Sequence, residues 1–308
     1  MAQKKPRSSQ PPTIDTLELK RLSLESGLDL CGVAPASELD GFGQRLDLWI
    51  EQGRHGAMAY MERWRDKRSD PRKLLPGAQS VVSVAVAYKP DTVMPAQARI
   101  AQYAYNADYH EVVKTRLYAL VAALRERYQG FEAKVCVDTA PISDKLWAAR
   151  AGLGWIGRNT LLVTPQFGSY VNLGELVTTS AFTTYDEPLA DGCGSCRRCL
   201  DACVSHAIDD TSRFYGVKAT ECTAYQTVEP TGEPSRSRKA RAGYIFGCDL
   251  CQTACPYCIE SPAVRHISPS RQAELEALAS SDESTFRRLA EHTSLSRIDY
   301  AHWRKNLE

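Results

Sequence analysis

The chain has 308 residues, a length that allows two domains and a sizeable hydrophobic core. Its 38 basic and 37 acidic residues nearly cancel, so the overall charge identifies no nucleic-acid partner and any RNA-binding surface must be local. No apolar run reaches membrane-spanning length, and the basic, proline-broken start lacks the apolar segment of a secretory signal. We therefore expect residues 1–13 to form a disordered tail, and the protein to be cytoplasmic, with reduced thiols and no membrane contact.

Residues 14–185 alternate between helical and strand-like patterns. Ser80–Tyr88 is a nearly continuous apolar run, which predicts a central strand covered on both faces. The alternation predicts an α/β sandwich as the first domain. The expected helices are Ile14–Ser26, a segment through Leu46–Ile50, Asp108–Tyr128 and Ser143–Ala151, and the other expected strands are Leu28–Ala34, Phe131–Val137 and a stretch between Val171 and Thr184.

Asp138 follows the predicted strand Phe131–Val137 and precedes Pro141. Catalytic carboxylates often stand at such strand-to-loop ends. A helix-capping or turn aspartate is an equally good interpretation of this residue alone, because Asp favours turns in any protein. Asp138 is thus a candidate catalytic residue whose role the local sequence leaves open.

Gly152, Gly154 and Gly157 match the spacing G-x-G-x-x-G of dinucleotide-binding folds. In those folds the glycines follow a strand and open a helix. Here the helical pattern Ser143–Ala151 comes before them, so we do not assign a dinucleotide site. We expect the glycines to let the backbone approach another large ligand closely.

Nine of the eleven cysteines fall between Cys193 and Cys258, and their spacing is regular. The first run reads C-x2-C-x2-C-x3-C and the second reads C-x2-C-x3-C followed by proline. This spacing matches bacterial ferredoxins, in which three close cysteines bind one 4Fe–4S cluster and the fourth binds a second cluster. The pattern therefore predicts a ferredoxin-like domain with two 4Fe–4S clusters over residues 186–262.

In the ferredoxin pattern the last cysteine of each run binds the cluster of the other run, and this rule assigns the ligands here. The first cluster takes Cys193, Cys196, Cys199 and Cys255, and the second takes Cys203, Cys248 and Cys251. Position 245 is Ile, so the second cluster needs a fourth ligand, which is either Cys222 or Cys258. Zinc usually takes paired two-cysteine knuckles and fits the four-cysteine run poorly, while disulfides would need an exported chain.

Two polar segments flank the second cysteine run. Before it, Arg236, Arg238, Lys239 and Arg241 form a basic cluster, which is either a solvated surface or a phosphate-contacting patch. After it, residues 263–308 carry helical patterns at Arg271–Ala279 and Glu283–Glu291. These patterns predict a short helical C-terminal segment.

Taken together, these segments resemble the epoxyqueuosine reductases, cobalamin-dependent iron–sulfur enzymes of queuosine-tRNA biosynthesis. The resemblance extends from about Leu19 to Pro256, and its most specific parts are HGAMAYM, DKRSDPRKLLPGA, VDTAPISDKLWAARAGLGWIGRNTLLVTPQFGSYVNLGELVTT, CGSCRRCLDAC and FGCDLCQTACP. It implies an α/β cobalamin-binding catalytic domain over residues 14–185, followed by the ferredoxin-like domain with its two clusters.

The resemblance also implies roles for single residues. Cys222 becomes the fourth ligand of the second cluster, and Cys258 is left without a cluster. Asp138 becomes the proton donor above the corrin, with a pKa that burial should raise. Lys145 stands where the family commonly has an arginine near the RNA. The positions implied to line cobalamin are Arg68, Asp138, Leu162, Leu173, Ala224, Cys248 and Asp249.

The implied reaction reduces an epoxide on the wobble base of tRNA to an alkene, which consumes two electrons and two protons and releases water. The clusters would pass electrons singly from an external low-potential donor to cobalamin, in a protein that we expect to be a monomer. Many members carry a C-terminal helical-repeat domain that helps to hold the tRNA, and this chain ends at Glu308 without room for it. We therefore expect Lys145 and the basic cluster to hold the anticodon loop at the active-site mouth.

Two other functions are compatible with paired clusters. A reductive dehalogenase shares cobalamin and two clusters, but such enzymes usually carry a twin-arginine export signal, which this sequence does not show. A ferredoxin-type electron carrier without catalysis of its own would need no corrinoid. Bound corrinoid and activity on epoxide-bearing RNA would distinguish the three.

Overall fold

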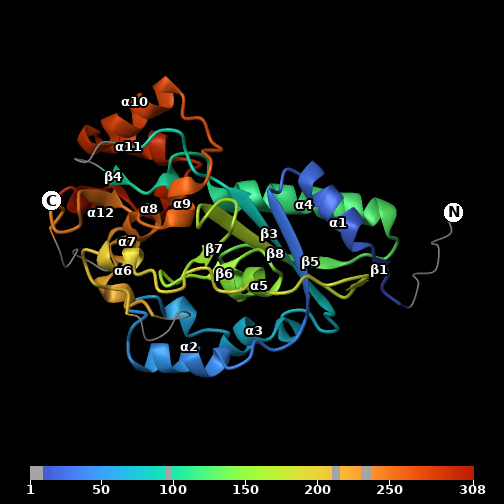
Figure 1. The fold of residues 1–308 in the computed structure, drawn as a ribbon. Coiled ribbons are helices and arrows are strands. Elements are labelled where there is room, and N and C mark those ends of the chain that lie inside the picture. Colours follow the sequence, from blue (N-terminus) through green and yellow to red (C-terminus); the bar gives the residue numbers. More distant parts are fainter. Residues whose placement is uncertain (1–9, 95–98, 210–215, 230–236) are drawn as a thin grey trace.

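The computed structural model describes residues 10–94, 99–209, 216–229 and 237–308, so most of the expected N-terminal tail and Arg236 lie outside the described residues. A four-stranded antiparallel sheet forms its centre (Figure 1). In spatial order the strands are β2 (Leu30–Pro35), β3 (Ser80–Ala87), β8 (Val171–Thr178) and β5 (Ala133–Cys136). Every residue of β3 is buried, which confirms the prediction of a central strand covered on both faces.

Helices cover both faces of the sheet, so the architecture has three layers. One face carries α1 (Thr16–Glu25) and α4 (Tyr109–Arg127), and the other carries α2 (Phe42–Glu51), α3 (Arg65–Ser69) and α5 (Asp144–Arg150). Figure 1 shows the two groups above and below the strands. Each group has its own apolar core, with Leu117 in the first and Trp147 in the second. Within the described residues, no helix is long and apolar enough to cross a membrane.

Capping residues explain where the predicted helices begin and end. Asp15 caps α1 by accepting a hydrogen bond from the Glu18 N–H at 2.9 Å. Gly27 follows the helix with a φ of 81°, as expected for a glycine that ends a helix. Asp108 caps α4 by accepting from the His110 N–H at 3.0 Å. The predicted helices and strands of residues 14–185 are present, with small shifts at their ends.

The remaining elements are short and surround the three layers. The strands are β1 (Thr13–Ile14), β4 (Arg99–Ile100), β6 (Trp155–Ile156), β7 (Leu162–Val163), β9 (Ala181–Phe182) and β10 (Tyr244–Phe246). The helices are α6 (Arg198–Asp201), α7 (Thr223–Val228), α8 (Leu250–Thr253), α9 (Pro256–Glu260), α10 (Pro269–Ala277), α11 (Glu283–Ala290) and α12 (Tyr300–Asn306). The 3-10 turns are η1 (Ala59–Met61), η2 (Pro71–Lys73), η4 (Gln102–Ala104), η5 (Ala219–Glu221), η6 (Leu278–Ser280) and η7 (Ser294–Arg297).

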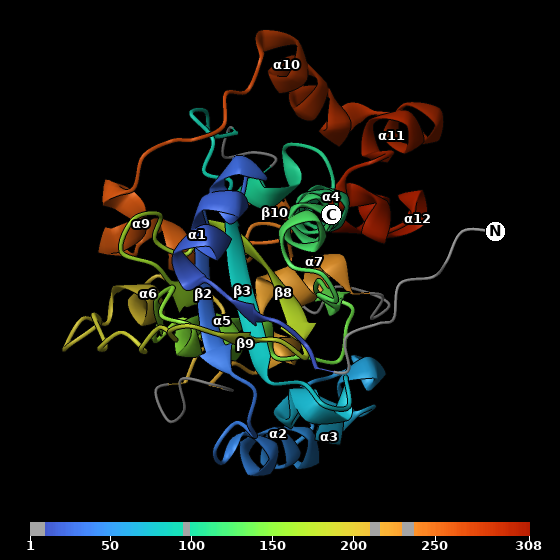
Figure 2. The same ribbon diagram turned by 90° about the vertical axis from the view of Figure 1, so that its right-hand side faces the viewer.

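A third core joins the C-terminal helices to the middle of the chain. It combines Tyr105 with Phe246 and with Phe286 and Trp303 of α11 and α12. β4 pairs with β10 in the same region, so segments far apart in the sequence meet there. Figure 2 places α10, α11 and α12 at the opposite end of the molecule from α2 and α3. The C-terminal segment is therefore held by contacts with Met94 and with residues 100–105 as well as by its own helices.

The structure corrects the expectation for the three glycines. A Cβ on Gly154 would lie 2.1 Å from the carbonyl oxygen of Val163, and one on Gly152 would lie 2.8 Å from that of Glu187. Gly157 is equally crowded by the protein's own side chains. The glycines thus allow two parts of this chain to approach each other, and the predicted approach to a large ligand is wrong.

Candidate active site

Two adjoining chambers open beside the end of β5, where the chain leaves the sheet. The first chamber has a volume of about 910 Å³ and the second a volume of about 540 Å³. The two chambers adjoin, because seven of the described residues line both of them. The residues of this shared wall are Tyr103, Tyr109, Asp138, Asp144, Lys145, Thr160 and Val217.

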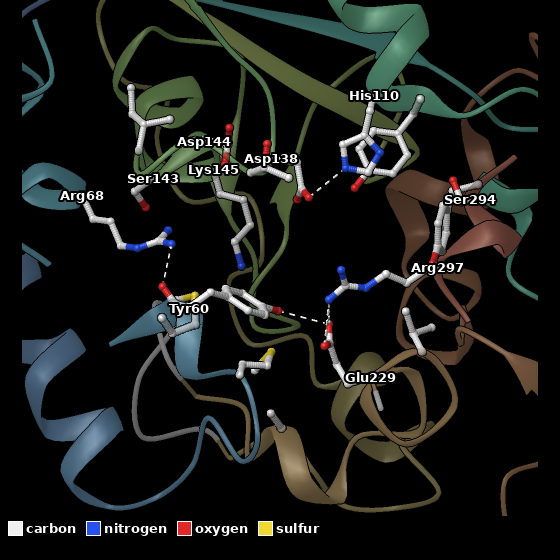
Figure 3. A pocket seen from close by; sticks show the side chains of 18 of the residues that line it. Tyr60, Arg68, His110, Asp138, Ser143, Asp144, Lys145, Glu229, Ser294 and Arg297 are labelled. Carbon is white, nitrogen blue, oxygen red and sulfur yellow. Dashed lines mark hydrogen bonds and ion pairs between the residues drawn. The ribbon is translucent and has the colours of Figure 1, made fainter. Parts of the chain in front are cut away.

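His110 links two carboxylates on the wall of the first chamber (Figure 3). Its Nε2 lies 2.9 Å from Asp138 Oδ2, and its Nδ1 lies 2.7 Å from Asp108 Oδ1. Asp108 is held in place because it also caps α4. Both ring nitrogens of His110 can donate to these acceptors only in the imidazolium form. The start of α4 therefore positions a cationic imidazole against Asp138.

The electrostatics of this pair correct the expected protonation of Asp138. Burial acts to raise the pKa of Asp138, but the hydrogen bond and charge of His110 outweigh it and hold the pKa below its ordinary value. The hydrogen bond to Asp138 raises the pKa of His110 in turn. The prediction of a raised pKa for Asp138 is therefore wrong, and the transferable proton of the pair resides on His110.

Asp138 adopts an unusual backbone conformation for its position. Its φ is 48°, in the left-handed region that few residues other than glycine occupy. Its side chain keeps about half of its surface accessible and lies on the wall shared by both chambers. Strained backbone of this kind is often retained where a side chain must point into a site. Here it directs the carboxylate away from β5 and into the cavity.

Four cysteines line the second chamber, namely Cys203, Cys222, Cys248 and Cys251. Burial, followed by the negative charges of neighbouring members of this group, raises the pKa values of the Cys248 and Cys251 thiols. Cys203 and Cys222 are among those neighbours for both. The structure thus brings together the four residues that the family resemblance assigned to the second cluster.

A separate group of cysteines lies outside the cavity. Burial, and then the charges of Cys193 and Cys255, raise the pKa of Cys199 to about 11, so these three thiols are close to one another. Cys196 lies one turn along the same loop, where its N–H donates to the Cys193 carbonyl at 2.9 Å. These four are the residues predicted for the first cluster.

Neither group has the geometry of a single-ion site. Among the residues that the structure describes, no three His, Cys, Asp or Glu side chains could hold one metal ion. A zinc ion would draw four thiolates to about 2.3 Å around one centre. An iron–sulfur cubane instead holds each cysteine on a different iron atom, so its thiolates stand farther apart. The spacing therefore favours clusters over zinc.

Cys258 has a different environment from both groups. It is buried, and its Sγ accepts a hydrogen bond from the Ser169 N–H at 3.2 Å. Its thiol also contacts Cys255, and it does not line the described cavity with Cys203 and Cys222. Of the two alternatives for the fourth ligand, Cys222 is the one that lies beside the other three.

Most of the positions predicted to line cobalamin do line the cavity. Arg68 and Asp138 lie on the first chamber, and Asp138, Leu173, Ala224, Cys248 and Asp249 lie on the second. Leu162 is the exception among these described residues, because its side chain packs in the core beneath α5 and is only 2% exposed. Its neighbour Leu161 lines the second chamber in its place.

The predicted RNA contacts are only partly brought to the cavity. Lys145 lies on the shared wall, where its Nζ donates to the Thr160 carbonyl at 2.6 Å. Arg241 is fully buried and donates to the Asn306 carbonyl at 3.0 Å, so the prediction that it contacts phosphate is corrected. Of the described members of the basic cluster, Arg238 and Lys239 also line neither chamber.

Sequence reasoning missed a charged group at the mouth of the first chamber. Arg297 of η7 donates to Glu229 Oε2 at 2.9 Å, and the Tyr60 hydroxyl donates to Glu229 Oε1 at 3.1 Å. Figure 3 shows Arg297 extending toward the cavity opposite Asp138. Residues 263–308 were expected only to form a short helical C-terminal segment. Nothing in the spacing of their residues links Arg297 to Asp138.

The chain has an antiparallel sheet, two groups of four thiols and a large pocket region lined by acidic side chains. These features are those of an iron–sulfur oxidoreductase that binds a large ligand. Two family models match the sequence: "Epoxyqueuosine reductase QueG, DUF1730" over residues 68–139 and "4Fe-4S double cluster binding domain" over residues 192–258. An epoxyqueuosine reductase of Leadbetterella byssophila is 39% identical over 242 residues, which cover 78% of each chain. The chain belongs to the epoxyqueuosine reductase family, and the two clusters of its matched domain are its iron–sulfur cofactors.

Solved structures agree with this assignment. The structure of epoxyqueuosine reductase from Streptococcus thermophilus matches with a TM-score of 0.84 and 29% identity, covering 94% of this chain and 79% of that one. A crystal structure of an epoxyqueuosine reductase with an epoxyqueuosine-modified tRNA-Tyr stem loop matches with a TM-score of 0.79 and 29% identity over the same shares. The fold is therefore that of a family whose members include an RNA-bound enzyme.

Proposed function

We propose that this chain reduces epoxyqueuosine to queuosine at the wobble position of tRNA, the last step of queuosine biosynthesis. The observation that carries the proposal is that Asp138 lines both of the adjoining chambers. His110 lies beside it on the first chamber, and the four thiols proposed for the second cluster lie on the second chamber. A substrate bound at Asp138 would have a proton source on one side and an electron source on the other.

Cobalamin is the cofactor that the family implies, and the cavity fits it in two respects. The two chambers lie side by side, with volumes of about 910 Å³ and about 540 Å³, so the site has room for a large ligand. Arg68 lines the first chamber with a buried Nε that has no hydrogen-bond partner among the described residues. Such an orphaned donor is costly unless a ligand satisfies it. Cobalamin bound there would supply a cobalt centre able to reduce a strained epoxide.

The remaining cobalamin contacts follow from the second chamber. We propose that Leu173 and Ala224 provide apolar contacts to the corrin. Asp249 is fixed by hydrogen bonds from the Gln102 N–H at 2.8 Å and from Gln252 at 3.1 Å, so it offers a rigid polar contact. Cys248 would serve both the corrin pocket and the second cluster.

Electrons would enter through the first cluster. Its loop is exposed at Asp191, Gly192, Gly194 and Ser195, whereas the second group of thiols faces the cavity. We propose that an external low-potential donor reduces the first cluster, which then reduces the second. The cysteine assignments proposed for this path are Cys193, Cys196, Cys199 and Cys255 for the first cluster and Cys203, Cys222, Cys248 and Cys251 for the second.

Asp138 would deliver the proton that the opening epoxide oxygen requires. Because its own pKa is low, the proton would come from His110 through their 2.9 Å contact, and Asp138 would orient it toward the substrate. Asp108 would keep the imidazole cationic and fixed. General acid catalysis of this kind commonly contributes about 10²–10⁴-fold to a rate.

RNA would enter at the mouth of the first chamber. Arg297 and Lys145 are cations on the chamber wall, and Tyr60 offers an exposed ring on which an unpaired base could stack. We propose that these residues hold the anticodon loop, in a protein located in the cytoplasm.

The test uses protein reconstituted anaerobically with iron, sulfide and cobalamin. Incubated with a reductant and an epoxyqueuosine-bearing stem loop, it should produce a nucleoside that has lost one oxygen atom, as detected by mass spectrometry. Reduction of an organohalide with no change in the RNA would favour the dehalogenase alternative instead. Full cluster loading without any corrinoid binding would favour an electron carrier.

A further inference from the structure

Glu175 is a buried acid in the middle of the central sheet. It lies on β8, opposite Cys136 of β5, and is 0% exposed. Its side chain lies on the face of the sheet that carries α5, because its strand neighbours Leu173 and Val177 at i−2 and i+2 both belong to the core on that face. A carboxyl group in such an apolar layer is costly unless it is neutral or paired.

The partner of Glu175 is another carboxyl group, that of Asp144. Asp144 is the first residue of α5, which packs on β8 over this face, and each of the two carboxyls shifts the pKa of the other. If both are ionised, neither Glu175 oxygen nor Asp144 Oδ1 has a hydrogen-bond donor among the described residues. Lys145 does not resolve this, because its Nζ donates to the Thr160 carbonyl. A proton held between the two carboxyls would pair one oxygen of Glu175 with one oxygen of Asp144 and would remove one of the two negative charges.

Asp144 also connects this buried pair to the cavity. It lies on the wall shared by both chambers, as Asp138 does, and Figure 3 shows both residues at this wall. We propose that Asp144 and Glu175 hold one shared proton and act as a second proton source for the reaction. This inference rests on the proposed function and deepens it, because the reduction consumes two protons and the pair of His110 and Asp138 supplies only one.

The two protons have separate destinations in a balanced reaction. As the first carbon–oxygen bond opens, the epoxide oxygen takes the proton from His110 by way of Asp138. As the second carbon–oxygen bond breaks, the hydroxyl takes the proton of the Asp144 and Glu175 pair and leaves as water. The two electrons come from the clusters, and the two carbons form the double bond. The buried pair is left with two negative charges, whose repulsion favours uptake of a proton from solvent.

The charges around the pair agree with a shared proton. Burial, partly offset by the interaction with Glu175 and assisted by the negative charge of Asp138, raises the pKa of Asp144 to about 6. Burial and the charge of Asp144 raise the pKa of Glu175 well above its ordinary value. The other facing groups are Arg68 from α3, which lowers the Asp144 pKa, Lys145 from α5, and Cys136 from β5, which raises the Glu175 pKa.

Infrared spectroscopy of the holoprotein tests the shared proton directly. The parent should show the C=O stretch of a protonated carboxylic acid at pH 7. Glu175→Gln should remove this band, whereas Asp144→Asn leaves Glu175 buried and neutral and should shift the band in frequency. Asp249, whose pKa burial raises to about 7, contributes equally to all variants and cancels in the difference spectra. Glu51→Gln, which alters an exposed carboxylate at the end of α2, should leave the band unchanged. A band that keeps its intensity in Glu175→Gln, or its frequency in Asp144→Asn, would overturn the shared proton.

Single-turnover reduction of the stem loop tests the role of that proton. Glu175→Gln should slow product formation at least tenfold with RNA binding unchanged, and should alter the alkaline limb of the pH profile. Loss of the band with an unchanged rate at every pH would make the pair structural only and overturn the proposal. If Glu175→Gln fails to retain its iron, Asp144→Asn provides the same test. If the parent itself does not reduce the RNA, the proposed function fails, while the infrared band still decides whether the proton is shared.

Discussion

His110 Nε2 lies 2.9 Å from Asp138 Oδ2, and this contact determines which member of the pair carries the proton. A lone Asp138 in a buried site would be a raised-pKa acid, as the sequence predicted. With a cation fixed beside it by Asp108, it is an ionised carboxylate that passes on a proton held by its neighbour. The pair can therefore donate a proton near neutral pH without a neutral aspartic acid.

The first prediction concerns pH. The hydrogen bond to Asp138 raises the pKa of His110 above its ordinary 6.5, so the imidazolium is complete below that pH and is lost as the pH rises through the raised value. The single-turnover rate should be level on the acid side and fall about tenfold per pH unit above the raised pKa. The ion pair's contribution to folding stability should disappear over the same range. Stopped-flow or quench measurements between pH 5 and about pH 9 would check this.

A glutamine variant provides the control for that profile. His110→Gln keeps a side chain able to hydrogen-bond Asp138 but removes the titration. We expect a rate lower by about 10²–10⁴-fold and loss of the part of the alkaline fall that the titration of His110 causes. An unchanged alkaline fall in this variant would assign the titration to another group.

The second prediction separates the two candidate ligands of the second cluster. Cys222→Ala should lose one cluster, so that the iron content falls from about eight to about four per chain. Cys258→Ala should retain both clusters, because that thiol is hydrogen-bonded by Ser169 and lies apart from Cys203 and Cys248. Iron and sulfide analysis with EPR of the reduced protein measures both. Loss of a cluster in Cys258→Ala alone would reverse the assignment.

Arg68 should contribute to corrinoid binding. Arg68→Ala removes the buried Nε that has no partner among the described residues, and a charged hydrogen bond of this kind contributes about 1.5–3 kcal/mol. Corrinoid affinity should fall roughly 10- to 150-fold, as measured by absorbance titration. Arg65→Ala is the matched control on the same helix, because Arg65 pairs with Asp47 at 2.9 Å and does not line the first chamber. Equal losses in the two variants would mean a general disturbance of α3.

The fourth prediction places an RNA contact at Arg297. Arg297→Ala should weaken binding of the stem loop and reduce the salt dependence by about 0.7 log units per log unit of salt, the value for one phosphate of a single strand. Arg287→Ala is the control, since Arg287 lies on α11 of the same segment, pairs with Glu283 and does not line the chamber. If Lys239→Ala changes the slope and Arg297→Ala does not, the RNA lies on the basic cluster instead.

The sequence predicted the features that depend on local spacing. The cysteine runs predict seven of the eight proposed ligands, because a cubane needs thiolates at short, regular intervals. Spacing left the eighth open between Cys222 and Cys258, and the family resemblance chose Cys222. Asp138 could be placed at a strand end because the apolar run before it is a strand in any tertiary context. The helices and strands of the sandwich followed from the same periodicity, with Asp15 and Asp108 as their caps.

Contacts between distant segments could not be predicted in this way. His110 stands 28 positions before Asp138, and only the packing of α4 on the sheet brings them together. Arg241 reads as a surface cation, yet the fold buries it against the carbonyl of Asn306. Glu175 reads as the polar residue of a strand, and its contact with Asp144 exists only because α5 covers that face. Tertiary structure sets the protonation of these groups.

The central claim is that Asp138 delivers a proton to a substrate that receives its electrons from the clusters. Single turnover of pre-reduced protein with one equivalent of epoxyqueuosine stem loop tests this claim most directly. The parent protein should convert the nucleoside with loss of one oxygen atom. The protein itself should be oxidised by two electrons. Asp138→Asn should bind the RNA and keep both clusters and the corrinoid, but form product about 10²–10⁴-fold more slowly. Product formation by Asp138→Asn at the parent rate would contradict the account.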